Sequence, residues 1–342
     1  MPQPSSLTFV GDILPLWIPY VPPERSLVGN FDGALLDRHQ FFHKAYPIGG
    51  QLKNMDIAFL TKFIALNLAN NHSFDAGKDM FKRSVEMIRS LGIVPYGFKE
   101  NPVAELKIGK NSVGIIGCLE RSFSRPSHLF KEEEVLDLIR SLKGRYDFLF
   151  VTPHWGKTSE FTPFASPVNL RLAQQWIDAG ASGVFGHRPH VLQGFSLYQE
   201  RPIYPSLGNF SFSHPQCDLF PITRLGLGVE VSFKGKALQC RDRYFFDRKP
   251  LKNTLGAENY FNELSGLHYS TFGWMRLMGK TYIRKSFGSW KFRLWNARNV
   301  LDPIKFLVWL FLPSTLLMLL MSLFEKTRVL YVLERRFQKI NP

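Results

Sequence analysis

Short apolar runs that end in polar side chains recur along the first 235 residues of this 342-residue chain. Each run has the length and composition of a strand that delivers polar groups to its carboxyl end. Stretches with helical spacing of apolar residues lie between these runs. The alternation predicts an α/β fold with a largely parallel or mixed central sheet. The predicted strands include 7–12, 26–33, 63–68 and 147–152, with 227–233 as an edge strand, and the predicted helices are 75–91, 132–142 and 169–179.

Several side chains that can bind metal ions stand at the ends of the predicted strands. Taken alone, each has an ordinary structural interpretation, as a turn aspartate, a helix-capping residue, a core histidine or part of a basic surface turn. Their common position favours one shared site, because open α/β sheets assemble sites beyond the carboxyl ends of their strands. Mixed oxygen and imidazole donors suit Mn, Fe or Zn in paired sites. The candidates are Asp12, Asp32, Asn71, His154, His187 and His190.

The strings around these residues resemble a known family. They are GD near the start, N-x-[DE]-G, ANNHSFDAG (69–77), HWG, GHRPHVLQG (186–194) and SLGNF. Together they are similar to the CapA family of poly-gamma-glutamate capsule biosynthesis proteins, over about residues 7–235. The resemblance implies a layered sheet core of the calcineurin-like metallophosphoesterase type.

The resemblance also implies two divalent metal ions and a role for each motif residue. Asp12 would bind the first ion, Asp32 would bridge, Asn71 would bind the second, and His154, His187 and His190 would complete the two sets of ligands. His72 would serve as a general acid, and Asp75 would orient it. Arg188 would contact the substrate. Asn209 would either contact the substrate or hold a metal ligand in place. Family members usually carry Glu where this chain has Asp32, so the shorter side chain would alter the metal spacing or the occupancy.

The chain changes character near residue 250. Residues 1–250 are expected to form the CapA-like domain, and 251–342 a basic, aromatic and helical C-terminal region. Residues 266–342 hold 13 Lys/Arg against 3 Asp/Glu, within a formal net charge of +15 for the chain. Residues 306–324 contain no charge and would span about 28 Å as a helix, close to the thickness of a bilayer core. This pattern predicts association with anionic membrane lipids, with a buried helix as the alternative.

The N-terminus has neither a basic segment nor a long apolar segment, so no signal peptide is expected. The chain is therefore expected at the cytoplasmic face of the membrane, held by its C-terminal apolar segment. Three cysteines without a CxxC pair disfavour a disulfide framework or a zinc knuckle.

The expected function is a two-metal hydrolase of poly-gamma-glutamate or capsule biosynthesis, acting on a phosphoester or a gamma-glutamyl polymer, in a complex with a polymer synthase. The first alternative is a non-catalytic, metal-binding accessory protein for synthesis or export of an anionic polymer. The second is a nuclease, suggested by the basic aromatic stretch 269–300. The neighbouring apolar segment makes lipid the simpler partner for that stretch, and nucleic acid is not expected.

Overall fold

A computed structural model of the chain describes residues 4–14, 21–23, 25–36, 49–51, 56–120, 128–156, 161–212, 217, 221–247 and 249–267. The predicted apolar segment 306–324 and nearly all of the basic C-terminal region lie outside these residues. Among the helices of the described part, none combines the length and the apolar character needed to cross a bilayer.

The first sheet has eight strands in the order β18-β17-β16-β1-β2-β5-β6, with β15 also paired to β1. Strands β1, β2, β5 and β6 run parallel, whereas β16 and β17 run antiparallel to their neighbours. Every residue of β1 and β2 is buried, as expected for strands covered on both faces. The bounds are β1 Ser6–Ile13, β2 Leu27–Phe31, β5 Phe63–Asn67, β6 Val94–Tyr96, β15 Asn209–Ser211, β16 Leu225–Lys234, β17 Ala237–Phe246 and β18 Lys249–Pro250.

The prediction that 227–233 forms an edge strand is wrong. Strand β16 lies between β1 and β17, and it pairs with β17 along its whole length. Gly235, whose φ of 62° suits a tight turn, sits in the two-residue loop that joins the two strands. The polar, half-exposed strand β17 therefore stands between β16 and the outer edge of the sheet.

The second sheet has six strands in the order β12-β13-β10-β9-β8-β7, with a parallel centre and antiparallel outer strands. Two small pairs, β11 with β14 and β3 with β4, complete the described strands. The bounds are β3 Ala34–Leu36, β4 Gly49–Gln51, β7 Val103–Ile108, β8 Asn111–Leu119, β9 Phe148–His154, β10 Gly183–Phe185, β11 Leu192–Gln193, β12 Ser196–Tyr198, β13 Arg201–Tyr204 and β14 Ser206–Leu207.

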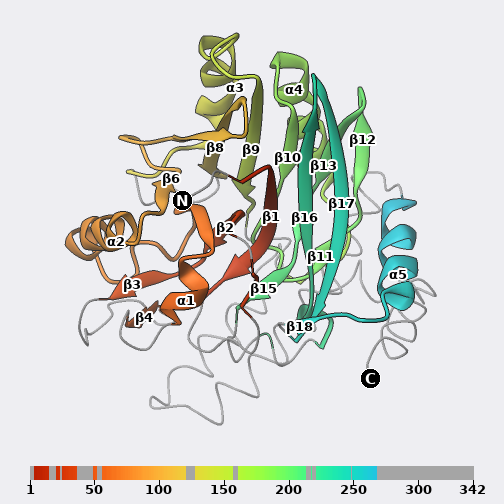
Figure 1. Cartoon of the computed structure of the whole chain (residues 1–342), viewed down its shortest axis with the longest axis horizontal. Helices are drawn as coiled ribbons and strands as arrows, with labels where there is room; N and C mark the ends of the chain where they lie inside the picture. The colour runs from red at the N-terminus through yellow and green to blue at the C-terminus, as the bar shows by residue number, and fades with distance from the viewer. Residues whose placement is uncertain are drawn as a thin grey trace, which may run out of the picture.

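The two sheets lie against each other, with helices on their outer faces (Figure 1). Phe9 of β1 stacks on Phe185 of β10 at 3.9 Å between ring centroids, so this face of β1 forms the core between the sheets. The next residue, Val10, points to the opposite face and joins the core under α1 and α2. Helices α3 and α4 cover the outer face of the second sheet. The helices are α1 Ile57–Leu60, α2 Lys78–Ser90, α3 Glu132–Ser141 and α4 Pro167–Ala179.

This arrangement confirms the predicted layered α/β core, and α2, α3 and α4 match the predicted helices to within three residues at each end. A further helix, α5 (Leu255–Ser265), packs on the core that contains Phe9 and Phe185, through Tyr260, Phe261 and Leu264. It belongs to the predicted C-terminal region, and the division at residue 250 stays a prediction. All three cysteines are free thiols.

Candidate metal site

The parallel strands of both sheets bring polar residues to one place. Asp12, near the end of β1, pairs in register with Asn30 on β2 and with Asn209 on β15. His154, the last residue of β9, forms a β-bridge with His187, which follows β10. Asn30 joins the two sheets, because its Nδ2 donates to Asp12 Oδ1 at 2.9 Å and lies 3.3 Å from His154 Nδ1.

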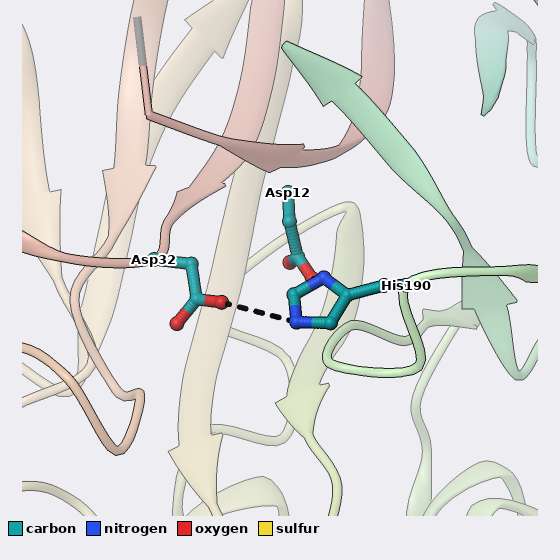
Figure 2. Close-up of side chains that lie close together, drawn as sticks. All are labelled: Asp12, Asp32 and His190. Carbon is teal, nitrogen blue, oxygen red and sulfur yellow. Dashed lines mark ion pairs between the residues drawn. The ribbon is translucent and has the colours of Figure 1, made fainter. Parts of the chain in front are cut away.

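Asp12, Asp32 and His190 form a compact group of potential ligands (Figure 2). One ligand atom from each lies within 4.8 Å of the others. His190 Nδ1 is 3.5 Å from Asp12 Oδ2, and His190 Nε2 is 4.0 Å from Asp32 Oδ2. The three residues are 0%, 1% and 5% exposed. Two carboxylates and one imidazole at this spacing are a donor set that divalent transition metals accept.

Asn209 holds the His190 ring in place. Asn209 Oδ1 lies 2.9 Å from His190 Nδ1, and its Nδ2 donates to the backbone oxygen of Thr223 at 3.2 Å. Phe212 stacks on the other side of the imidazole, with 4.6 Å between ring centroids. Asn209 was expected to contact the substrate, but it is only 7% exposed and contacts His190, a candidate metal ligand.

Asn71 and His154 form a second group of candidate ligands. His154 Nε2 lies 2.7 Å from Asn71 Oδ1. His187 is buried beside Asp12, with 3.6 Å between His187 Nδ1 and Asp12 Oδ1. Asn30 links this group to the first, and sequence reasoning had not singled it out. The signal was available, since Asn30 is the first residue of the N-x-[DE]-G motif.

Burial governs protonation in this site. Burial raises the pKa of Asp12 to about 7, against hydrogen bonds from Asn30 and the backbone of Arg188. Burial lowers the pKa of His187 to about 3. Burial, followed by the charge of Arg188, lowers the pKa of His154 well below its ordinary value. Both imidazoles are therefore neutral near pH 7, which is the form that binds metal ions.

Two buried polar atoms test whether the site fits a bound cation. Asn30 Oδ1 and His187 Nδ1 are buried and make no hydrogen bond in the described part of the chain. Orphaned buried donors and acceptors are costly and rare, and a bound ion is one accepted reason for them. With the carboxylates of Asp12 and Asp32 beside them, these atoms make the residues present compatible with divalent metal.

His72 and Asp75 form a hydrogen-bonded pair in the turn between β5 and α2. His72 Nδ1 lies 2.6 Å from Asp75 Oδ2, and the side chains are 14% and 3% exposed. Asn70 Oδ1 accepts from the His72 backbone N–H at 3.0 Å, and Asn70 Nδ2 donates to the backbone oxygen of Phe31 at 2.6 Å. The turn is thus attached to the end of β2, one residue before Asp32.

Arg188 lies inside the site, so the alternative of a basic surface turn for GHRPH is wrong. The residue is 5% exposed, its backbone N–H donates to Asp12 Oδ2 at 3.2 Å, and its guanidinium donates to the backbone oxygen of Gly156. Burial lowers the pKa of Arg188 to about 10, against the charges of Asp32, Glu120 and Asp12, so the side chain stays charged. Its φ of 86° is a left-handed conformation that costs on the order of 1–3 kcal/mol for such a residue.

Comparison with known proteins places the chain in a family. The chain is 28% identical over 215 residues to the capsule biosynthesis protein CapA of Bacillus anthracis, covering 57% of this chain and 52% of that protein. It is 27% identical over 202 residues to the PGA biosynthesis protein CapA of Bacillus subtilis, covering 54% and 53%. The chain thus spans about half the length of these curated relatives.

A phosphatase of known structure from Mycoplasma pneumoniae is 14% identical, with a TM-score of 0.45, over 72% of this chain and 95% of that protein. The family model for the bacterial capsule synthesis protein PGA_cap matches residues 19–214. This match covers more than half of the chain, and the chain belongs to the PGA_cap family of bacterial capsule synthesis proteins.

Proposed function

We propose that the chain is a metal-dependent hydrolase of capsule biosynthesis that cleaves a phosphoester or a gamma-glutamyl polymer. The observation that carries this proposal is the buried group of Asp12, Asp32 and His190, whose ligand atoms lie within 4.8 Å of one another. Membership of the capsule synthesis family supports the biological setting.

In this proposal Asp12, Asp32 and His190 hold one divalent ion, and Asn71, His154 and His187 contribute to a second position. A divalent ion bound there would polarise the scissile group and lower the pKa of a bound water. At the first position the carboxylates of Asp12 and Asp32 already lie within 4.0 Å of the His190 nitrogens. Arg188 adds a buried positive charge that favours an anionic phosphate or carboxylate of the substrate.

His72 is the proposed general acid. Asp75 accepts the Nδ1 hydrogen, which fixes the tautomer and orientation of the ring and stabilises its protonated form. A proton on Nε2 can then pass to the leaving oxygen or nitrogen as the bond to it breaks. Asp75 acts through His72 and is a positioning residue.

Replacement of the general acid should lower kcat by an amount that depends on the leaving group. We expect His72→Ala to lower kcat about 100-fold or more on an alkyl phosphate diester, whose leaving group needs a proton. The loss should be much smaller on bis(p-nitrophenyl) phosphate, because nitrophenolate leaves without protonation. The measurement is kcat on both substrates together with metal content by elemental analysis, which should not change.

Asp79→Asn is the matched control, since Asp79 is an exposed carboxylate in the first turn of α2 and should leave both rates unchanged. Asp75→Asn should lower kcat on the alkyl ester by about tenfold with KM unchanged. An equal loss on both substrates in His72→Ala, or a parallel loss of bound metal, would contradict the role of general acid.

The broader proposal is tested by metal analysis of the purified chain, followed by a panel of phosphoester and gamma-glutamyl substrates. Metal-dependent turnover of either class supports a hydrolase. Bound metal without turnover of any member of the panel would refute the hydrolase and favour the non-catalytic accessory protein for an anionic polymer.

The proposal extends to location and partners. The uncharged segment 306–324 and the basic residues around it would hold the chain on anionic lipid at the cytoplasmic face, beside a polymer synthase. Truncation before residue 306 should move the protein from the membrane pellet to the supernatant on fractionation. A truncated chain that stays in the pellet would contradict this attachment.

A further inference from the structure

We propose that the two metal positions are unequal: the Asp12, Asp32 and His190 position is preset and fills first, whereas hydrogen bonds with Asn30 and Asn71 hold His154 in a form that opposes ligation. This inference rests on the metal binding proposed above and deepens it.

The hydrogen bonds around His190 place the lone pair on Nε2, the nitrogen that faces Asp32 and can bind a metal ion. Asn209 donates through Nδ2 to the backbone oxygen of Thr223, so the Oδ1 atom is the one that faces His190 Nδ1 at 2.9 Å. An amide oxygen only accepts, and Nδ1 must therefore carry the hydrogen. In the neutral ring, Nε2 then holds the lone pair, and it lies 4.0 Å from Asp32 Oδ2. Partners of this kind fix the tautomer of metal-binding histidines.

The hydrogen bonds around His154 have the opposite sense. Asn30 presents Nδ2 to the carboxylate of Asp12 at 2.9 Å, and the same nitrogen lies 3.3 Å from His154 Nδ1. An amide nitrogen only donates, so Nδ1 accepts. The hydrogen of the neutral ring is then on Nε2, which donates to Asn71 Oδ1 at 2.7 Å. The nitrogen that would ligate the second ion therefore points a hydrogen at the other proposed ligand.

Ligation by His154 Nε2 requires the ring to change tautomer. The hydrogen would then sit on Nδ1 and face the Nδ2 hydrogens of Asn30, which places two donors against each other. Rotation of the Asn30 amide would relieve this conflict but would bring its Oδ1 to the carboxylate oxygen of Asp12. Either choice loses a buried hydrogen bond, which weakens binding at the second position.

Arg188 adds a charge effect in the same direction. Its guanidinium donates to the backbone oxygen of Gly156, two residues after His154. The guanidinium is buried and positively charged. A second divalent cation beside His154 would meet this charge, whereas the first position contains two carboxylates to offset it.

A titration of the chelator-treated 342-residue chain with Mn²⁺ tests the inference, with free Mn²⁺ measured by electron paramagnetic resonance. We expect one tight ion per chain and a second that binds at least about tenfold more weakly. Two ions of equal affinity would overturn the inference while leaving the proposed metal site standing. No bound ion at all would refute the proposed metal site itself.

Variants separate the two positions. His190→Ala should abolish the tight ion, and Asn209→Leu should weaken it about 10- to 100-fold by removing the acceptor for Nδ1. His154→Ala should leave the tight ion within about threefold of the original affinity. Asn30→Asp, whose carboxylate only accepts, should narrow the affinity ratio of the two ions. A loss of the tight ion in His154→Ala as large as that in His190→Ala would overturn the inference.

The tautomers of His190 and His154 can be measured in the unsubstituted protein without added metal. Two-bond ¹H–¹⁵N spectra of the metal-free chain should assign hydrogen to Nδ1 of His190 and to Nε2 of His154. Hydrogen on Nδ1 of His154 in the metal-free protein would contradict the arrangement and the inequality drawn from it.

Discussion

At pH 8, Asp12→Asn should be more stable than the original protein without metal and less stable than it with metal. Without metal the variant is expected to unfold at a higher temperature than the original protein, and with saturating Mn²⁺ at a lower one. The reason is that burial raises the pKa of Asp12 from 3.8 to about 7, so at pH 8 the folded protein holds an ionised carboxylate that is costly to bury. A metal ion offsets this cost, and asparagine removes both the cost and the ligand.

The sign follows from proton linkage. The unfolded chain releases the Asp12 proton near pH 3.8 and the folded chain near pH 7, so the free energy of unfolding falls as the pH rises between these values. The shift of about three pKa units corresponds to roughly 4 kcal/mol above pH 7, and lost hydrogen bonds in the variant offset about 1–2 kcal/mol of the gain. Metal at 1,000 times its Kd adds about 4.1 kcal/mol to the original protein alone, which exceeds the roughly 2–3 kcal/mol that remains of the variant's gain.

Thermal denaturation at pH 5 and pH 8, with chelator or Mn²⁺, measures all four conditions. Asp147→Asn is a control of opposite sign. Hydrogen bonds from Ser112 lower the pKa of that exposed carboxylate, so its variant should lose stability at pH 8 and should not affect the metal response. A metal-free Asp12→Asn protein that is less stable than the original at pH 8 would refute the account of Asp12.

Most of the strands that carry the site could be predicted from the sequence, because buried parallel strands are short apolar runs. Their carboxyl ends lie at one edge of the sheet, which predicts that the polar residues there share a site. Asp12, Asp32 and His190 do come together, and His154 and Asn71 are in contact. The position of β16 could not be predicted in the same way. Its place inside the sheet depends on β17, whose polar alternation gives only a weak strand signal.

The hydrogen bonds that distinguish the two halves of the site were also beyond the sequence. Asn30 and Asn209 both pair in register with Asp12, one from β2 and one from β15. Asp12 and Asn209 are 197 positions apart in the sequence (209 − 12) and meet only through sheet pairing. The donor or acceptor facing each imidazole then depends on contacts with Thr223 and Asp12. No local pattern encodes these contacts.

Gly11→Ala should be strongly destabilising, although it adds a single methyl group beside the site. A Cβ at Gly11 would lie 2.1 Å from the backbone oxygen of Gly208 and 3.0 Å from that of Leu207. Neither atom can rotate away, and Gly208, at φ 66°, is itself held in a left-handed conformation. Strand β1 would have to separate from the segment before Asn209 and lose the hydrogen bond from Asp12 N to Gly208 O.

We expect a loss of about 3 kcal/mol or more in the free energy of unfolding, measured by urea denaturation of the metal-free chain. Gly266→Ala is the matched control, because its φ is −78° and the nearest atom to its Cβ would be 3.6 Å away. That variant should change stability by no more than about 1 kcal/mol. Any Gly11→Ala protein that folds should also bind Mn²⁺ more weakly, since the clash displaces Asp12 from Asn209, which orients His190. Nearly original stability with unchanged affinity would mean that this close approach of the two backbones does not hold the site together.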